Sequence, residues 1–87
     1  MRILVIEDDA LTAQSIEFAL APEGIICDKA HLGREGIEVG RLYDYDLIIL
    51  DLMLPDIDGY EVLLRLRSSK VKIPVLILSG LTTPEQK

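Results

Sequence analysis

The sequence predicts an α/β domain in which a parallel sheet is covered by helices on both faces. Short apolar runs rich in valine and isoleucine alternate with segments of helical apolar spacing, beginning and ending with a strand. Two of these runs are followed by acidic residues: the run at 2–6 by Glu7 and Asp8, and the run at 47–50 by Asp51. Because the carboxyl ends of parallel strands meet at one edge of a sheet, we expect these carboxylates to converge.

The first strand is predicted at residues 2–7, and the first helix follows it directly. Asp8 or Asp9 can cap that helix by accepting hydrogen bonds from its first backbone N–H groups. Pro22 and Gly24 are typical of a helix end and terminate this helix. Its apolar residues at helical spacing are Leu11, Ile16, Ala19 and Leu20.

The second strand begins at residues 25–27 and ends near Ala30. Gly33 and Gly36 bracket the start of the second helix. The apolar positions of that helix are Ile37, Val39 and Leu42. The third strand, at residues 46–51, is the most hydrophobic of the four predicted strands.

The loop after the third strand contains Pro55 and Gly59, and a third helix follows at residues 60–68. In this helix we expect an inward apolar face and an outward basic face, formed by Val62, Leu63 and Leu66 and by Arg65 and Arg67. The fourth strand, at 74–78, precedes Ser79 and Gly80. Residues 83–85, Thr-Pro-Glu, predict the start of a further helix, with threonine as the cap and proline at the first helical position.

The composition limits the class of protein. With 87 residues the chain makes one small domain of marginal stability. Its net charge of −6 argues against nucleic-acid binding by this chain alone. The single cysteine, Cys27, excludes an internal disulfide and a cysteine-based metal site, and fits the cytoplasm. The first residues are too short and too charged for a signal peptide, and no apolar run approaches the roughly 18 residues that span a membrane.

Carboxylates held close together repel one another unless a proton or a cation is present. A hard divalent ion such as Mg²⁺ suits a site made only of oxygen ligands. The residues therefore predict a Mg²⁺ site around Glu7, Asp8 and Asp51. The alternative role of the first cluster, helix capping by Asp8 and Asp9, is compatible with it because different residues can serve each role. His31 is interpreted as a solvated loop residue.

Three motifs occur in a recognisable order: VIEDD at 5–9, DLMLPDIDG at 51–59 and LSG at 78–80. On a chain of alternating strands and helices they resemble the receiver domain of two-component response regulators. The resemblance implies a flavodoxin-like (CheY-like) doubly wound sheet of strand order 2-1-3-4 with the fifth strand missing. Residues 1–87 would then be a receiver domain truncated at its C-terminus. Segments 11–17 and 43–46 further resemble a bacterial cell-cycle transcriptional regulator of this family.

The resemblance also implies roles for the site residues. Asp51 would be the phosphoacceptor, and Ser79 would contact the phosphoryl group and report its presence. Asp8 would bind Mg²⁺ directly and Glu7 through water, with Asp51 and the backbone carbonyl of Met53 as further ligands. The implied partner is a histidine kinase or histidine phosphotransferase. DNA would be bound only through a C-terminal output domain absent from this chain. Such a receiver is a phosphorelay switch and not a turnover enzyme.

One departure from the family concerns a lysine that receivers carry at the end of a fifth strand, usually before a proline. This chain has no Lys-Pro pair: Lys70 and Lys72 precede the fourth strand, and Lys87 follows no strand. We expect phosphorylation to survive while the conformational response is impaired. We also expect the fourth strand to be an exposed edge, which favours a homodimer or a domain-swapped oligomer.

Two alternative functions stay open. The first is a Mg²⁺-dependent phosphohydrolase with an aspartate nucleophile. Such enzymes usually place a second aspartate two residues after the first, where this chain has Met53. The second is an interaction module that is never phosphorylated. The missing lysine supports that module, whereas the intact acidic pair and Asp51 do not.

Overall fold

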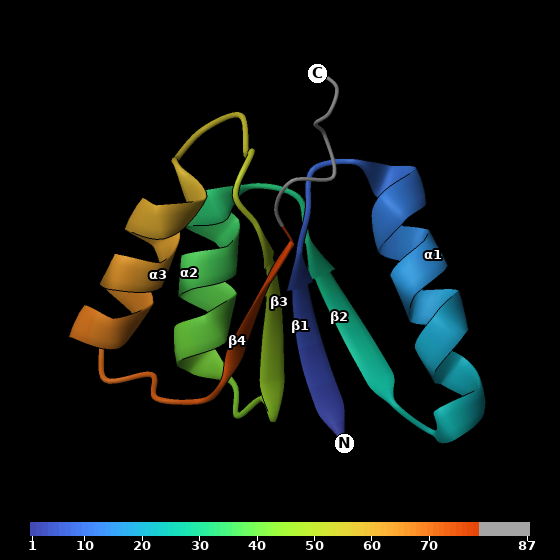
Figure 1. The fold of residues 1–87 in the computed structure, drawn as a ribbon. Coiled ribbons are helices and arrows are strands. Elements are labelled where there is room, and N and C mark those ends of the chain that lie inside the picture. Colours follow the sequence, from blue (N-terminus) through green and yellow to red (C-terminus); the bar gives the residue numbers. More distant parts are fainter. Residues whose placement is uncertain (79–87) are drawn as a thin grey trace.

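A computed structural model of the chain describes residues 1–78, and in this range strands and helices alternate as the sequence predicts (Figure 1). The strands are β1 (Arg2–Ile6), β2 (Ile26–Ala30), β3 (Leu47–Asp51) and β4 (Val75–Leu78). The helices are α1 (Ala10–Leu20), α2 (Gly33–Leu42) and α3 (Gly59–Ser68), with a 3₁₀ turn at Ala21–Glu23. The helix start predicted at residues 83–85 lies outside the described residues.

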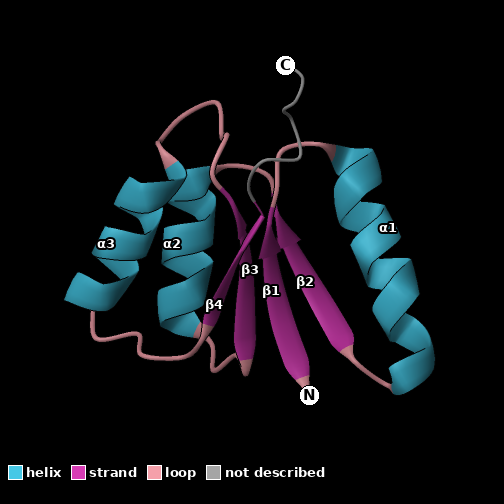
Figure 2. Cartoon of the chain, in the orientation of Figure 1, coloured by secondary structure: helices cyan, strands magenta, loops and turns pink. Residues whose placement is uncertain are grey.

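The four strands form one parallel sheet in the order β2-β1-β3-β4. Helix α1 lies on one face, and α2 and α3 lie on the other (Figure 2). This arrangement confirms the predicted doubly wound fold and the strand order 2-1-3-4. Within the described range β4 is an edge strand.

The pairing of β1 with β3 fixes which residues meet at the carboxyl edge of the sheet. Ile6 at the end of β1 is the partner of Leu50 in β3. The residues that follow this pair are Glu7 and Asp51, so the register brings them side by side. Gly36 of α2 lies close to Ile6, since a Cβ added to this glycine would stand 2.5 Å from Ile6 Cδ1.

The core has two parts, one on each face of the sheet. Between the sheet and helices α2 and α3 lie Leu4, Ile6, Ala30, Ile37, Tyr45, Ile48, Leu50, Val62 and Leu66. Between the sheet and α1 lie Ile3, Val5, Ala13, Cys27 and Ile49. Both faces of the central strands are therefore buried, as expected for parallel strands that read as continuous apolar runs.

The ends of the helices follow the predicted signals, with one difference. Gly24 ends the first helical region in the left-handed conformation, with φ of 75°, after Pro22 has entered the 3₁₀ turn. Gly36, predicted to bracket the start of the second helix, instead lies inside it, one turn after the first residue, Gly33. Helix α2 needs a residue without a side chain at this position because it packs directly on Ile6 of β1.

Not every apolar residue that predicted a helix belongs to the core. Leu11 is 73% exposed and Leu42 is 69% exposed, and Ala19 is exposed as well. In α1 the stripe against the sheet is Ala13, Ile16 and Leu20. Leu11 lies about 200° around the helix from Ala13, because each residue turns an α-helix by about 100°. Helical spacing therefore identified the helix, while the sheet determined which side is buried. In α3, Val62 and Leu66 are buried and Arg65 and Arg67 are exposed, as predicted.

Candidate functional site: an acidic cluster at the carboxyl edge of the sheet

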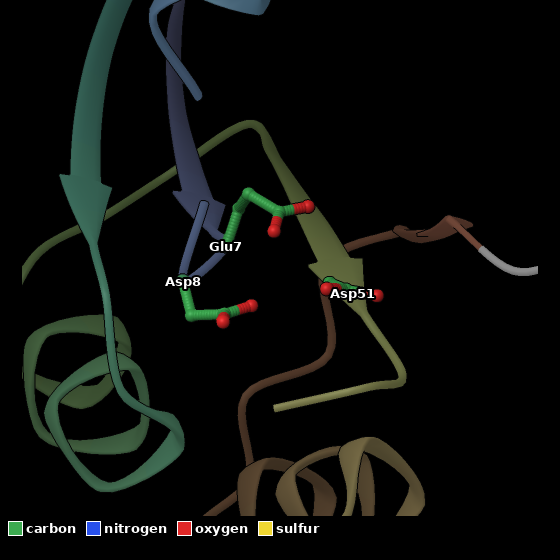
Figure 3. A group of neighbouring side chains, drawn as sticks. All are labelled: Glu7, Asp8 and Asp51. Atoms are coloured by element: carbon green, nitrogen blue, oxygen red, sulfur yellow. The ribbon is translucent and has the colours of Figure 1, made fainter. Parts of the chain in front are cut away.

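The carboxylates of Glu7, Asp8 and Asp51 converge beyond the ends of β1 and β3. Each contributes an oxygen atom, and these atoms all lie within 4.8 Å of one another. Figure 3 shows the side chains of Glu7 and Asp8 reaching from the end of β1 toward Asp51. Glu7 is 4% exposed, Asp51 is half-buried, and Asp8 is exposed. The predicted convergence is confirmed, and the cluster opens to solvent on the side of Asp8.

The turn after β1 separates the site residues from the residue that caps the helix. The backbone N–H of Glu7 donates to the carbonyl oxygen of Ala30 over 2.9 Å, which continues the pairing with β2. Asp9 caps α1: its carboxylate accepts from Leu11 N at 3.3 Å and from Thr12 Oγ1 at 2.6 Å. Of the two capping candidates it is therefore Asp9 that caps the helix, and the carboxylate of Asp8 lies in the acidic cluster.

The loop after Asp51 folds back onto the end of β3. Met53 N donates to Asp51 Oδ1 over 3.0 Å, and Gly59 N donates to the carbonyl oxygen of Leu52 over 3.2 Å. A Cβ at Gly59 would lie 2.5 Å from Leu52 Cα and 2.8 Å from the carbonyl oxygen of Asp51. Those neighbours are backbone atoms, so only glycine permits this approach. The loop thereby holds the backbone of Met53 beside the carboxylate of Asp51.

Electrostatics make the cluster a site for a proton or a cation. Burial, together with the nearby carboxylates of Asp51 and Asp8, raises the pKa of Glu7 to about 7. The N–H of Asp9 opposes this rise by donating to Glu7 Oε2 over 3.0 Å. Three convergent carboxylates, of which the buried Glu7 resists ionisation, fit a hard divalent cation such as Mg²⁺, which takes oxygen ligands.

Two residues near the site were missed as site residues by the sequence analysis. His31 is exposed, as predicted, but its Nδ1 lies 3.1 Å from the carbonyl oxygen of Glu7. Asp56 bonds the start of α2 through its carboxylate. The sequence held an indirect signal for Asp56. The N-cap residue of α2 is Leu32, whose side chain accepts no hydrogen bonds, so a polar residue from elsewhere in the chain has to cap this helix. No comparable signal exists for His31.

The remaining predicted site residue, Ser79, lies outside the described residues, and its contact with a phosphoryl group stays a prediction. The ligand role of the Met53 carbonyl also stays a prediction. Within residues 1–78, no helix has the length and apolar character needed to cross a membrane.

Comparison with known proteins defines the class. The family model described as "Response regulator receiver domain" matches residues 3–87. The chain therefore belongs to the response-regulator receiver family, as its motifs indicated.

Within that family the chain is similar to the cell cycle response regulator CtrA. It is 59% identical over 87 residues to CtrA of Brucella ovis, covering all of this chain and 38% of that protein. This agrees with the resemblance of segments 11–17 and 43–46 to a cell-cycle regulator. The chain thus spans well under half the length of this relative.

Solved structures give the same fold. The receiver domain of the Francisella response regulator 1452 has a TM-score of 0.86 and 36% identity, covering 99% of this chain and 71% of that one. Response regulator TrrA from Thermotoga maritima, solved in complex with Mg²⁺-BeF, has a TM-score of 0.85 and 32% identity. That match covers 93% of this chain and 70% of the Thermotoga protein.

Proposed function

We propose that residues 1–87 act as a phosphorelay receiver that accepts a phosphoryl group on Asp51 in a Mg²⁺-dependent step. The observation that carries the proposal is the convergence of the Glu7, Asp8 and Asp51 carboxylates within 4.8 Å in a member of the receiver family. The complex of the Thermotoga relative with Mg²⁺-BeF supports the choice of ion.

Each residue of the site has a separate role in this step. Asp8, Asp51 and the Met53 carbonyl would hold Mg²⁺, with Glu7 acting through water. Bound Mg²⁺ would offset negative charge on the transferring phosphoryl group. A carboxylate oxygen of Asp51 attacks phosphorus, and the new O–P bond replaces the N–P bond of a phosphohistidine. The histidine ring leaves as neutral imidazole after taking a proton from water. Catalysis then rests on positioning and charge rather than on an acid or base of this chain.

The wider role extends beyond this chain. The relative is named as a cell cycle response regulator, and this chain covers 38% of its length. We therefore propose that phosphorylation here controls a DNA-binding output domain outside these residues, with a histidine kinase or phosphotransferase as donor. The cytoplasm is the proposed compartment, as the family and the single cysteine suggest. Among the described residues β4 lies at an edge of the sheet and its Leu76 is 53% exposed; we propose a homodimer or a swapped oligomer through this strand.

The two alternatives are less well supported. A phosphohydrolase needs a general acid near the nucleophile, yet the position two residues after Asp51 is Met53, whose side chain is 71% exposed. An interaction module that is never phosphorylated does not account for three convergent carboxylates, because their mutual repulsion destabilises the fold when no cation is bound. We therefore assign the chain to switching and not to turnover.

The test is intact-mass analysis after incubation with a small phosphodonor, in Mg²⁺ and in EDTA. We expect one phosphoryl group per chain, only in Mg²⁺ and not in Asp51→Asn. The matched control is Asp58→Asn, which changes an aspartate of the same loop that caps α3; it should still be labelled. Absence of an adduct on folded protein would contradict the proposal. Continuous release of many phosphates per chain would instead indicate the phosphohydrolase.

A further inference from the structure

Helix α2 receives its N-terminal cap from a distant loop. Its own N-cap residue, Leu32, has no polar side chain, so the first backbone N–H groups need another acceptor. Asp56, from the loop between β3 and α3, supplies it. Its Oδ1 accepts from Gly33 N at 2.8 Å and its Oδ2 accepts from Arg34 N at 3.0 Å. The Arg34 side chain adds a contact of 3.4 Å from Nε to Oδ2.

The loop is seated tightly at this point. The Asp56 side chain is 11% exposed. A Cβ at Gly33 would lie 3.3 Å from Asp56 Oδ1, 3.3 Å from Ile57 Cβ and 2.9 Å from Val62 Cγ2. Glycine at the first position of α2 therefore leaves room for the carboxylate to reach the helix. The backbone N–H of Arg34, followed by that of Gly33, lowers the pKa of Asp56 to about 2.

The two other aspartates of this region make different bonds. Asp58 accepts from Tyr60 N at 2.7 Å, within its own helix start, and Asp51 accepts from Met53 N at 3.0 Å, within its own turn. Among the described loop residues 52–58, only Asp56 has a side chain that hydrogen-bonds to a separate helix or strand. Both oxygens of Asp56 accept hydrogen bonds from backbone N–H groups of α2. The role of this carboxylate therefore differs from that of the three carboxylates in the acidic cluster.

We propose that Asp56 is a positioning residue of the phosphoacceptor site: by bonding the N-terminus of α2, it fixes the loop that carries the Met53 carbonyl. The inference rests on the proposed function, because it concerns the same Mg²⁺ site. Met53 stands three residues before Asp56 and two after Asp51, so the loop is held at one end by β3 and at the other by α2. Without the second attachment the carbonyl would lose its defined position relative to Asp51.

The test compares Asp56→Ala, Asp56→Asn and Asp58→Ala in this chain. Backbone NMR follows the amides of residues 51–59 during titration with MgCl₂, and thermal unfolding is measured in parallel. Both alanine variants lose a helix cap, so both should lower Tm. Of the two alanine variants, only Asp56→Ala should raise the Kd for Mg²⁺, by roughly tenfold, which is the lower end of the range for residues that orient metal ligands indirectly. Asp56→Asn, which keeps one acceptor oxygen, should be intermediate.

The outcomes separate the two proposals. Equal Mg²⁺ affinity for wild type, Asp56→Ala and Asp56→Asn would overturn the positioning role while leaving the proposed function in place. Equal losses of affinity for Asp56→Ala and Asp58→Ala would show a general effect of stability, and would also overturn it. If Asp56→Ala does not fold, Asp56→Asn carries the comparison. Wild-type protein that binds no Mg²⁺ would overturn the proposed function and this inference with it.

Discussion

Replacing Glu7 by glutamine isolates the electrostatic cost of the acidic cluster. Glu7 is 4% exposed and faces two other carboxylates. Glutamine has nearly the same shape and keeps a side-chain oxygen for the hydrogen bond from Asp9 N. The substitution therefore removes the buried charge with little change in packing, and the free energy of unfolding should rise wherever that charge is unfavourable.

The size and the pH range of the effect follow from the pKa of Glu7. That pKa is about 7 in the fold, against an ordinary value of 4.5. Each pKa unit corresponds to about 1.4 kcal/mol, so the folded state is destabilised by up to about 3 kcal/mol once Glu7 ionises in both states. Between pH 4.5 and 7 the unfolded chain has released this proton and the folded chain has kept it. Stability therefore falls as pH rises through this window and is level above it.

The assay is urea unfolding followed by circular dichroism, in EDTA, at several pH values from 4 to 8. At pH 8, Glu7→Gln should be more stable than wild type by up to about 3 kcal/mol, and at pH 4 the two should coincide. Mg²⁺ should stabilise wild type more than the variant, because binding to the folded state adds to its stability. The control Glu38→Gln, on the exposed side of α2, should change stability by no more than about 0.5 kcal/mol.

Two results would refute this reasoning. If Glu7→Gln were no more stable than wild type at pH 8, the buried carboxylate would carry no electrostatic cost. If its advantage were the same at pH 4 and at pH 8, the effect would come from packing and not from ionisation.

Two further predictions concern the packing that supports the site. Gly36→Ala places a Cβ 2.5 Å from Cδ1 and 2.7 Å from Cγ1 of the buried Ile6. The free energy of unfolding, measured in urea, should fall by about 1–3 kcal/mol. An unchanged value would mean that Ile6 moves aside freely. Tyr45→Phe removes the 2.6 Å hydrogen bond that, first among its partners, lowers the pKa of Asp28. The pKa of Asp28 should rise in a carboxyl NMR titration, with a loss of about 1–2 kcal/mol at neutral pH, whereas an unmoved pKa would assign the effect to Arg2.

The sequence was sufficient for the strands, the fold class and the convergence of the cluster. Apolar runs such as 47–50 have few alternatives to a buried strand, and alternation with helices specifies a parallel sheet. In a parallel sheet the residues that follow the strands share one edge, so Glu7 and Asp51 had to approach each other once β1 and β3 were neighbours. Local pattern and topology therefore determine this part of the site.

The contacts that could not be predicted from the sequence depend on the path of the loops. Asp56 reaches Gly33 across 23 residues, and the His31 ring reaches the Glu7 carbonyl across 24. Neither partner is recognisable until the turns of the chain are known. The exposure of Leu11 has a related cause, since helical spacing defines a stripe but not its rotation against the sheet.

The register that pairs β1 with β3 in the core also holds the carboxylates of Glu7 and Asp51 close together, where they repel each other in the absence of a cation. Ile6 and Leu50 are fully buried partners in β1 and β3, and Glu7 and Asp51 follow them with no intervening residue. The strand pairing holds the backbones of Glu7 and Asp51 side by side, so the repulsion between their carboxylates is opposed by the burial of the two strands. A cation or a proton relieves the repulsion, and this relief contributes to the free energy of cation or proton binding. Substitutions that loosen the contact between β1 and β3 should therefore weaken Mg²⁺ binding as well as stability, even when they leave every carboxylate in place.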